Sequence, residues 1–367
     1  MKDIVVIGAG KIGSAIARLL TECGDYRVTV ADHSREQLDR IEAHPALSTA
    51  VVNIEDSADL EKLLAGKFAV LSAAPFQLTI RIAEAAARMD VHYMDLTEDV
   101  ESTRKVKALA EKANVALIPQ CGLAPGFISI VANDLASRFE KIDSIRMRVG
   151  ALPQFPSNAL NYNLTWSTDG LINEYIQPCE AIVEGDLIEV PALEEREEFS
   201  LDGVTYEAFN TSGGLGTLCE TLKGKVRTLN YRTIRYPGHV SIIKALLNDL
   251  GLRHRREVLK DIFENALPAT MQDVVVIFVT VSGYNNGRLI QETYANKVYS
   301  AKIAGAMLSA IQITTAAGIC TVLDLLAAGE IPTKGFVRQE EISLEKFLAN
   351  RFGGFYAPEV RASPRAA

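Results

Sequence analysis

Along the first 120 positions, short continuous apolar runs take turns with longer segments in which apolar residues recur at helical spacing. Short runs rich in Val, Ile and Leu predict buried parallel strands, because such strands are covered on both faces. These runs occupy residues 3–7, 27–30, 69–72, 92–96 and 115–119, with a shorter candidate at 50–52. Residues with helical spacing separate them, at 14–20, 35–43, 56–64, 79–88 and 100–109. Strands alternating with helices indicate right-handed βαβ units and therefore an α/β fold with a doubly wound parallel sheet.

The pattern changes near residue 140. Residues 226–235 alternate like an antiparallel strand, and residues 273–282 and 289–299 predict a hairpin because Asn286-Gly287 lies between them. Further strand-like runs occupy 142–149 and 181–190, and residues 303–328 predict a long apolar helix in which Gly305 and Gly318 permit close packing. We therefore expect a second α+β domain built on a largely antiparallel sheet.

Four segments follow from these patterns. Residues 1–125 are predicted to form the domain with the parallel sheet, and residues 126–302 the second, α+β domain. Residues 303–350 are expected to form a helical segment that packs back on the first domain. Residues 357–367 are predicted to be disordered.

A glycine motif, G-x-G-x-x-G, follows the first strand at residues 8–13. Gly8 allows a tight turn, Gly10 lets the backbone approach a pyrophosphate, and Gly13 lets the helix pack closely on the strand. The start of that helix offers free N–H groups to the pyrophosphate. Glycines kept only for the geometry of the turn are the simpler alternative. The strand before the motif, the helix after it and the acid at Asp32 together favour a Rossmann-type dinucleotide site.

The identity of the dinucleotide depends on the residue that meets the adenosine ribose. Asp32 lies 19 residues after Gly13, where a carboxylate can accept hydrogen bonds from the ribose hydroxyls. It would repel the 2′-phosphate of NADP by about 1–4 kcal/mol. Arg35 is a counter-signal, because a nearby Arg can receive that phosphate. We expect NAD. The predicted cofactor-binding residues are Gly8, Gly10, Lys11, Ile12, Gly13, Asp32, Ala73, Ala74, Pro75, Leu96, Gly122 and Leu123.

Composition excludes several other classes of protein. The 367 residues include 48% hydrophobic and 23% charged positions, and the net charge of −8 without a basic cluster argues against a nucleic-acid partner. No run approaches about 18 consecutive apolar residues, and the first strand leaves no room for a signal peptide, so we expect no membrane partner. The five cysteines and five histidines are scattered, which indicates reduced thiols, a cytoplasmic location and no metal site.

Several motifs together resemble the saccharopine dehydrogenase / lysine 6-dehydrogenase family. They are the glycine loop, the D-L-T at 95–97, C-G-L-A-P-G at 121–126, Y-N-L-T-W-S-T-D-G at 162–170, A-F-N-T-S-G-G at 208–214 and R-Y-P-G-H at 235–239. The resemblance implies NAD-dependent oxidative deamination of the ε-amine of L-lysine to 2-aminoadipate 6-semialdehyde, which cyclises to a piperideine carboxylate. It also implies a homodimer joined through the second domain.

Two positions depart from the glutamate-forming saccharopine dehydrogenases. These relatives have Asp where Ala124 stands and Arg where Asp169 stands in the W-S-x-x-G stretch. An acid at that position would repel a second substrate carboxylate and tolerate an ammonium group, which favours lysine. Saccharopine and a carboxynorspermidine-like polyamine remain alternative substrates, and an NAD(H)-binding regulator without catalysis is the alternative class.

Oxidation at C6 requires a neutral ε-amine, so the site must accept a proton from lysine, whose ordinary pKa in water is about 10.4. We expect catalytic roles for His239, Asp95 and Tyr162. A lone His is more often structural, and Asp95 could simply cap a helix. Arg235 is predicted to hold the α-carboxylate by its planar fork, or else to be a surface Arg. The predicted substrate-binding residues are Thr97, Glu98, Cys121, Trp166, Asp169, Asn210, Thr211, Ser212 and Arg235.

Overall fold

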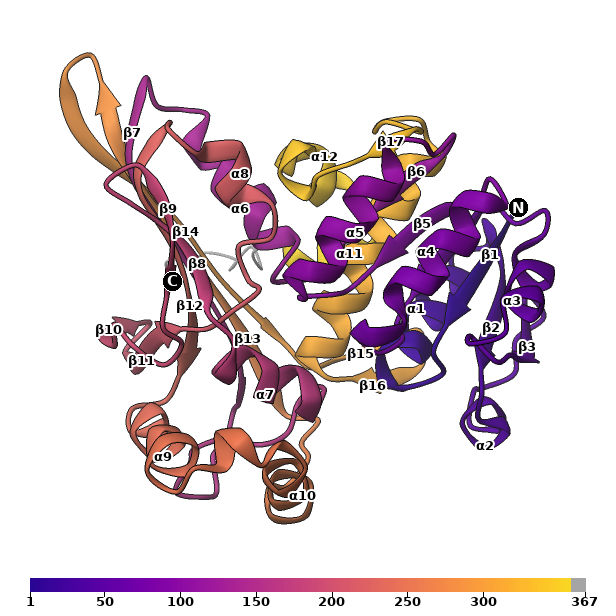
Figure 1. The fold of residues 1–367 in the computed structure, drawn as a ribbon, viewed down its shortest axis with the longest axis horizontal. Helices are drawn as coiled ribbons and strands as arrows, with labels where there is room; N and C mark the ends of the chain where they lie inside the picture. Colours follow the sequence, from indigo (N-terminus) through magenta and orange to yellow (C-terminus); the bar gives the residue numbers. More distant parts are fainter. Residues whose placement is uncertain (358–367) are drawn as a thin grey trace, which may run out of the picture.

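The computed structural model describes residues 1–357 and contains a seven-stranded parallel sheet, with six strands from residues 2–118 and one from the C-terminal segment (Figure 1). The strand order is β17-β6-β5-β4-β1-β2-β3, so β1 to β6 follow the 3-2-1-4-5-6 order of dinucleotide-binding sheets. The strands are β1 (Lys2–Ile7), β2 (Tyr26–Asp32), β3 (Leu47–Val51), β4 (Ala69–Ser72), β5 (His92–Asp95), β6 (Ala116–Ile118) and β17 (Gly335–Phe336).

Helices cover both faces of this sheet. Strand β1 shows why its sequence is apolar from Ile4 onward: Ile4 and Val6 face one core cluster, and Val5 and Ile7 face the other. The first cluster includes α1 (Lys11–Glu22), and the second includes α3 (Ser57–Leu64), α4 (Thr79–Arg88) and α5 (Val100–Ala110). The short helix α2 (Arg35–Asp39) ends earlier than the predicted 35–43 helix.

The second sheet has the order β10-β11-β12-β7-β13-β14, with the hairpin β8–β9 attached to β12. Its described pairings are antiparallel except for β7 with β12, which is parallel. The strands are β7 (Lys141–Pro153), β8 (Cys179–Val183), β9 (Asp186–Val190), β10 (Glu197–Leu201), β11 (Val204–Asn210), β12 (Val226–Arg235), β13 (Asp273–Asn285) and β14 (Arg288–Tyr299). The short helices around it are α7 (Thr168–Ile176), α8 (Leu218–Leu222), α9 (His239–Lys244) and α10 (Arg256–Ala266).

Two helices join the halves into one continuous core. α6 (Phe127–Ala136) and α11 (Ala310–Ala327) lie between the parallel sheet and the second sheet (Figure 1), and their apolar residues share a cluster with both. α11 is long and apolar enough to cross a membrane by length and composition, but 78% of its 18-residue window is buried inside the protein, as in a core helix.

The two glycines predicted to help this helix pack have different roles. Gly318 does pack closely, because an added Cβ would lie 2.6 Å from the carbonyl oxygen of Cys121. The helix begins at Ala310 and not near residue 303, so the expectation for Gly305 is wrong. Gly305 lies with φ +82° in the turn between β15 (Ala301–Ile303) and β16 (Ala306–Leu308), where the helical pattern is interrupted.

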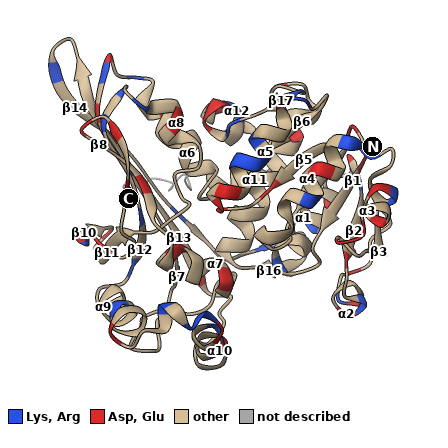
Figure 2. Ribbon diagram, in the orientation of Figure 1, with Lys and Arg blue, Asp and Glu red and all other residues tan. Residues whose placement is uncertain are grey.

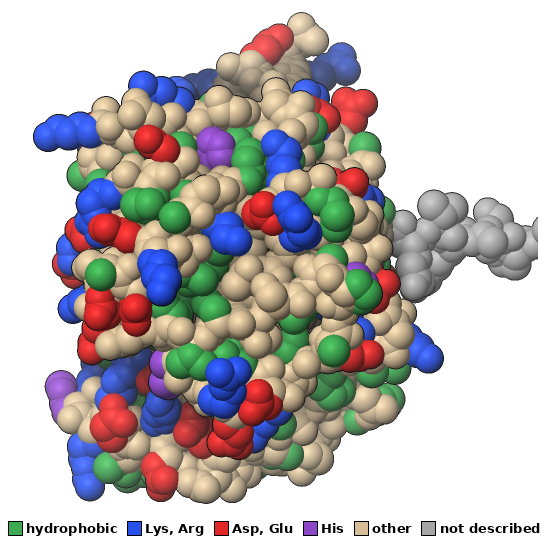
Figure 3. All heavy atoms as spheres, turned by 90° about the vertical axis from the view of Figure 1, so that its right-hand side faces the viewer, with side chains coloured by type: hydrophobic (Ala, Val, Ile, Leu, Met, Phe, Trp, Pro, Cys, Tyr) green, Lys and Arg blue, Asp and Glu red, His purple; other side chains and the backbone are tan. Residues whose placement is uncertain are grey.

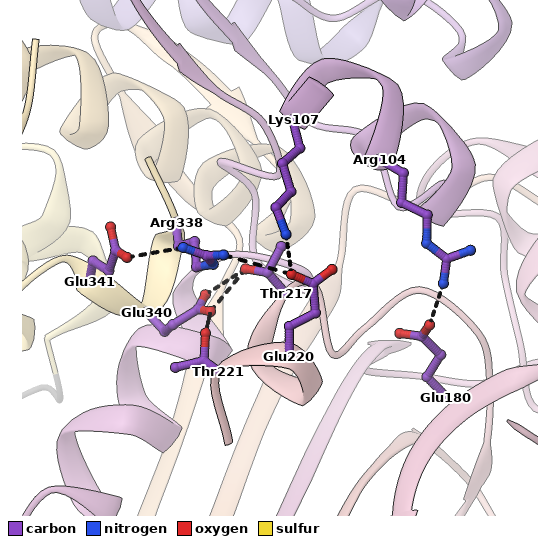
Figure 4. A network of polar contacts seen from close by, with 9 residues as sticks. All are labelled: Arg104, Lys107, Glu180, Thr217, Glu220, Thr221, Arg338, Glu340 and Glu341. Atoms are coloured by element: carbon purple, nitrogen blue, oxygen red, sulfur yellow. Dashed lines mark hydrogen bonds and ion pairs between the residues drawn. The ribbon is translucent and has the colours of Figure 1, made fainter. Parts of the chain in front are cut away.

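The C-terminal segment returns to the first domain through β17 and α12 (Leu344–Ala349). A polar network holds it against the second domain (Figure 4). Glu340 is buried and accepts hydrogen bonds from the hydroxyls of Thr217 (2.9 Å) and Thr221 (2.6 Å), which lie at α8. Lys107 of α5 pairs with Glu220 of α8, so α5, α8 and the C-terminal segment meet at this network.

The predicted fold class, a Rossmann sheet with a second α/β-type domain, is confirmed by this architecture. The second sheet is mixed, because β12 runs parallel to β7. Acidic and basic positions are interspersed over both halves (Figure 2), and the face in Figure 3 shows both signs without a continuous basic band. The tail predicted to be disordered lies outside the described residues, apart from Ala357.

Candidate functional site

A cavity of about 340 Å³ lies between the two halves, at the carboxyl ends of β4, β5 and β6. Ligands of doubly wound sheets bind at this edge. The second sheet contributes its inner face through β7 and β12, and α7 and the start of α11 complete the walls. Nine predicted cofactor-side or substrate-side positions line it near the first domain: Ile12, Ala73, Ala74, Pro75, Leu96, Thr97, Glu98, Gly122 and Leu123.

The glycine loop has the geometry that its motif predicts. Gly8 has φ +106°, and a Cβ there would lie 2.8 Å from the carbonyl oxygen of Ala73. A Cβ on Gly13 would lie 1.8 Å from the carbonyl oxygen of Gly8, so only glycine fits. Around Gly10 there is nothing within 4 Å of an added Cβ. The loop is therefore closed on its protein side and open where a pyrophosphate would approach.

Asp32 ends β2 and holds this loop in place. Its carboxylate accepts hydrogen bonds from the backbone N–H of Ala9 (2.7 Å) and of Ser34 (2.8 Å). Each carboxylate oxygen keeps a further lone pair, so the same group can still accept from a ribose hydroxyl. The α1 helix starts at Gly10 without a side-chain cap, which leaves its first N–H groups for an anion. The residues present fit a nicotinamide dinucleotide.

Arg235 provides the buried positive charge of the cavity. It ends β12 and is 3% exposed. Its Nε donates to the hydroxyl of Tyr175 (3.0 Å), and its Nη1 donates to Thr233 Oγ1 (2.6 Å) and to the carbonyl of Ile234 (2.8 Å). Among the described residues no hydrogen bond engages Nη2, which leaves that N–H group for a ligand. The alternative of a surface Arg is wrong, because this strand end is enclosed.

Besides Asp169, two carboxyl groups line the same cavity, Glu98 after β5 and Glu174 in α7. Burial raises the pKa of Glu98 to about 7 and that of Glu174 to about 8, and Arg235 only partly opposes the latter shift. Within the described part of the chain, neither carboxyl forms a hydrogen bond with another side chain. Both groups therefore titrate near neutral pH, where a proton acceptor is most effective.

Trp166 and Asp169 lie at the start of α7. The Trp166 ring packs on Gly170, where a Cβ would lie 2.4 Å from the ring, and it forms part of the cavity wall. Asp169 also reaches the wall, but its carboxylate pairs with Lys260 (2.6 Å) and lies 3.8 Å from Arg256. The negative charge that was expected to repel a second substrate carboxylate is therefore paired within the protein. The helix cap is Ser167, whose hydroxyl accepts from the N–H of Gly170.

Asp95 does not line the cavity. Its carboxylate accepts from the N–H groups of Thr97 (3.0 Å) and Gln120 (2.9 Å) and from the hydroxyl of Tyr93 (2.7 Å). These contacts join the ends of β5 and β6. Burial raises the pKa of Asp95 to about 6 against these hydrogen bonds. The structure places this residue as a support beneath the site and not in contact with a substrate.

His239 and Tyr162 are also outside the cavity lining. His239 is fully enclosed, with Nδ1 2.9 Å from the carbonyl of Leu160 and Nε2 3.0 Å from the hydroxyl of Tyr175. Burial, with the Arg235 charge beside it, lowers the pKa of His239 to about 3. The Tyr162 ring lies under Arg235, with 5.0 Å between the ring centroid and Cζ. Neither side chain is presented to a substrate as the sequence analysis expected.

Four predicted substrate-binding residues stand behind the wall. Cys121 lies beneath it, with its thiol 3.0 Å from the carbonyl of Ile118 and accepting from Gln339, and burial raises its pKa well above the usual value. Asn210 pairs by its backbone with the 193–194 segment, and the N–H of Ser212 donates to the carbonyl of Glu174. Thr211 is buried and also outside the lining. This stretch therefore supports α7 and does not contact the cavity directly.

Glu174 is the one acidic residue of the cavity lining, among the described residues, that the sequence did not single out. It is the single acid in an otherwise buried stretch, residues 170–175, and a buried carboxyl at an apolar helical position was an available signal. The other cavity-lining polar residues without a sequence prediction are Gln77, Ser167, Tyr231, Thr233 and Thr315. In the described residues no cluster of three or more His, Cys, Asp or Glu side chains is placed to hold a metal ion, and all five cysteines are free.

The fold and the site define a two-domain dinucleotide-binding protein with a substrate cavity between its domains. Residues 4–118 match the Saccharopine dehydrogenase NADP binding domain, and residues 122–352 match the Saccharopine dehydrogenase C-terminal domain. The chain belongs to the saccharopine dehydrogenase family.

Individual relatives are distant. Alpha-aminoadipic semialdehyde synthase of Bos taurus is 21% identical over 81% of this chain, and the match covers 33% of that protein. Saccharopine dehydrogenase [NADP(+), L-glutamate-forming] of Saccharomyces cerevisiae is 23% identical over 68% of the chain and 58% of the relative. The chain thus spans about a third of the bovine protein. The solved apo structure of the L-Glu forming saccharopine dehydrogenase of S. cerevisiae has a TM-score of 0.75 at 17% identity, covering 93% of this chain and 94% of that one, and shows the shared fold.

Proposed function

We propose that this protein is an NAD-dependent oxidoreductase that deaminates the ε-amine of L-lysine. The observation that carries the proposal is the charge arrangement of one cavity, in which Arg235 faces two carboxyl groups, Glu98 and Glu174. A lysine-sized substrate has one carboxylate for Arg235 and an ammonium group for the acids. The product, 2-aminoadipate 6-semialdehyde, would cyclise to piperideine-6-carboxylate.

The reaction requires removal of one hydride and then replacement of nitrogen by oxygen. When bound, the nicotinamide accepts the hydride from C6. The side chains of this protein take up the proton balance: a carboxylate receives a proton from the ε-ammonium, so that a neutral amine is present when the C–H bond breaks. Water then adds to the carbon of the resulting iminium ion, and the nitrogen leaves as ammonium. The proton that the carboxylate received is the only one released in the overall reaction.

Glu174 is the favoured proton acceptor. Its pKa of about 8 lies closer to that of an ammonium than the usual carboxyl value, so the proton transfer is less unfavourable. Glu98 lies close enough for its charge to raise the pKa of Glu174, so ionisation of one acid makes ionisation of the other less favourable. A substrate ammonium between them would favour their ionised forms.

The choice of NAD over NADP depends on Asp32. Its carboxylate occupies the end of β2, where a 2′-phosphate would approach it, at a cost of about 1–4 kcal/mol. The matched domain description and the yeast relative both name NADP, so this preference is a property proposed for this chain alone.

The test is the ratio of kcat/KM for NAD to that for NADP. We expect at least about tenfold in favour of NAD, and a smaller ratio in Asp32→Ser. Arg35→Ala serves as the matched control, because it removes a neighbouring charge without touching the loop. Equal kcat/KM values for the two cofactors in the unaltered protein would contradict the NAD assignment.

Saccharopine is the second candidate substrate, because the relatives carry its name. Its additional carboxylates would have to lie in a cavity where one Arg faces two acids. Parallel assays of NADH formation with lysine, saccharopine and a polyamine panel separate the candidates. Efficient oxidation of saccharopine by the unaltered protein would overturn the lysine assignment, and cofactor binding without oxidation of any amine would favour a regulator.

The resemblance to this family also supports a homodimer as a proposal, and the scattered free cysteines support a cytoplasmic location. Light scattering on the purified full chain measures the oligomeric state directly, with a mass near twice 40.0 kDa expected.

A further inference from the structure

A continuous chain of hydrogen bonds runs behind the cavity to Arg235. The carbonyl oxygen of Leu160 lies 2.9 Å from Nδ1 of His239, and Nε2 of His239 lies 3.0 Å from the hydroxyl of Tyr175. That hydroxyl accepts a hydrogen bond of 3.0 Å from Nε of Arg235. Only Arg235 among these side chains lines the cavity.

The partners fix the direction of every hydrogen bond in this chain. A carbonyl oxygen can only accept, so Nδ1 of His239 carries the proton. An imidazole enclosed beside a guanidinium is neutral, and therefore Nε2 accepts from the hydroxyl of Tyr175. The oxygen of Tyr175 then has its lone pairs free for the N–H of Arg235. One tautomer of one histidine thus determines the orientation of the tyrosine hydroxyl.

The surroundings leave the guanidinium little freedom. Its Cζ lies 5.0 Å from the ring centroid of Tyr162 and 5.7 Å from that of Tyr175, so two aromatic faces enclose it. Nη1 is engaged by Thr233 and by the carbonyl of Ile234. Removing the hydroxyl of Tyr175 would leave Nε as the unpaired donor.

We propose that His239 and Tyr175 are positioning residues that hold Arg235 with its free N–H group directed at the substrate carboxylate. The proposal rests on the proposed function, since it takes a carboxylate as the group that Arg235 binds. It gives His239 a role in affinity for the carboxylate end of the substrate, and no part in the proton transfer at C6.

The consequence is selective for one end of the ligand. Loss of the Tyr175 hydroxyl should weaken ligands that carry a carboxylate, and it should leave ligands without one unchanged. L-Norleucine has the carboxylate and lacks the ε-amine, whereas cadaverine has the amines and lacks the carboxylate. Trp166 is the only tryptophan and lies in the cavity wall, so its fluorescence reports occupancy by either ligand without turnover.

The experiment compares the unaltered protein with Tyr175→Phe in the presence of NADH. We expect the Kd of lysine and norleucine to rise roughly 5- to 30-fold, as for loss of a hydrogen bond to a charged group, and that of cadaverine to change less than twofold. In steady state, KM for lysine should rise while kcat falls less than threefold. Tyr294→Phe is the matched control, because its partly buried hydroxyl donates to the carbonyl of Tyr356, away from the cavity.

A double-mutant cycle tests whether the effect passes through Arg235. In an Arg235→Met background, Tyr175→Phe should add less than twofold to the Kd of norleucine. His239→Gln keeps an acceptor near the position of Nε2 and should resemble the unaltered protein, whereas His239→Asn cannot reach Tyr175 and should resemble Tyr175→Phe. Two-bond ¹H–¹⁵N spectra should show His239 as the neutral tautomer protonated at Nδ1.

The outcomes separate this proposal from the proposed function. Equal losses for norleucine and cadaverine, additive effects in the cycle, or a kcat loss above 100-fold in His239→Gln with unchanged Kd would overturn the positioning role. Selective weakening of norleucine in a protein that does not oxidise lysine would support the positioning role and refute the proposed activity. Failure of norleucine to bind the unaltered protein would overturn the carboxylate assignment itself.

Discussion

In the cofactor half of the site, the glycines of the loop lie within six consecutive residues, and each is fixed by contacts with its own neighbourhood. In the substrate half, Glu98, Glu174 and Arg235 come from a strand end of the first domain, a helix of the second and a strand end of the second sheet. Local geometry determines the first group, and packing between domains determines the second. The cofactor half can therefore be recognised as one local motif. The residues of the substrate half are scattered along the chain, and Glu174 becomes visible only in the cavity.

The largest expected effect concerns the substrate half. Glu174→Gln removes the proposed proton acceptor while keeping the size of the side chain, so kcat with lysine should fall by about 10²–10⁴. NADH binding should be unchanged, because the residue lies away from the glycine loop. Steady-state kinetics and nicotinamide fluorescence measure the two quantities. Glu98→Gln is the matched variant, and a larger loss there would exchange the roles of the two acids.

The cofactor half can be tested by a pair of similar substitutions. Gly13→Ala introduces a Cβ 1.8 Å from a carbonyl oxygen, so the backbone must move, and Tm should fall by about 3–10 °C. Gly10→Ala meets no protein atom within 4 Å, so Tm should stay within about 1 °C. Its methyl group nevertheless occupies the path of the pyrophosphate, and NADH affinity should fall roughly 10- to 100-fold. An unchanged Kd in Gly10→Ala would mean that the cofactor does not approach this loop.

A smaller effect is expected on stability without ligands. The pKa of Glu174 is raised from 4.5 to about 8 in the folded protein, so the folded state binds more protons than the unfolded state between these pH values. Its contribution to the free energy of unfolding is therefore fully present below pH 4.5 and is lost as pH rises through 8, by up to about 1.4 kcal/mol per pH unit.

Glu174→Gln cannot titrate and should flatten this dependence. Urea unfolding at several pH values between 5 and 8 measures it, with the unaltered protein losing stability relative to the variant as pH rises. A constant difference between the two proteins over this range would show that Glu174 keeps an ordinary pKa. The same substitution thus tests the environment of the acid independently of catalysis.

The smallest effect should come from Asp169, which the W-S-x-x-G motif singled out. Its carboxylate is neutralised by Lys260 and Arg256 at a partly exposed position, so Asp169→Asn should change kcat/KM for lysine less than threefold. Lys260→Gln is the matched control from the other side of the pair. A loss above tenfold in Asp169→Asn alone would mean that the carboxylate turns toward the substrate.

The parallel sheet could be predicted from the sequence alone, because residues 4–7 and the corresponding later runs are mostly apolar and amphipathic helices separate them. It also determined the glycine loop and Asp32, since a run of glycines between a strand and a helix has one geometry. The end of the helix near residue 328 was predictable, but its start was not, because the hairpin at 301–308 is as apolar as the helix that follows it.

Only the tertiary structure decided which polar residues face a substrate. Asp95, His239 and Glu174 are all buried, and their sequence neighbourhoods give no reason to rank them. Both carboxylate oxygens of Asp95 and both ring nitrogens of His239 take part in hydrogen bonds within the protein. The carboxyl of Glu174, by contrast, faces the cavity. A polar side chain can bind a ligand only if the fold has not already given it a hydrogen-bond partner. These partners come from segments that are distant in the sequence.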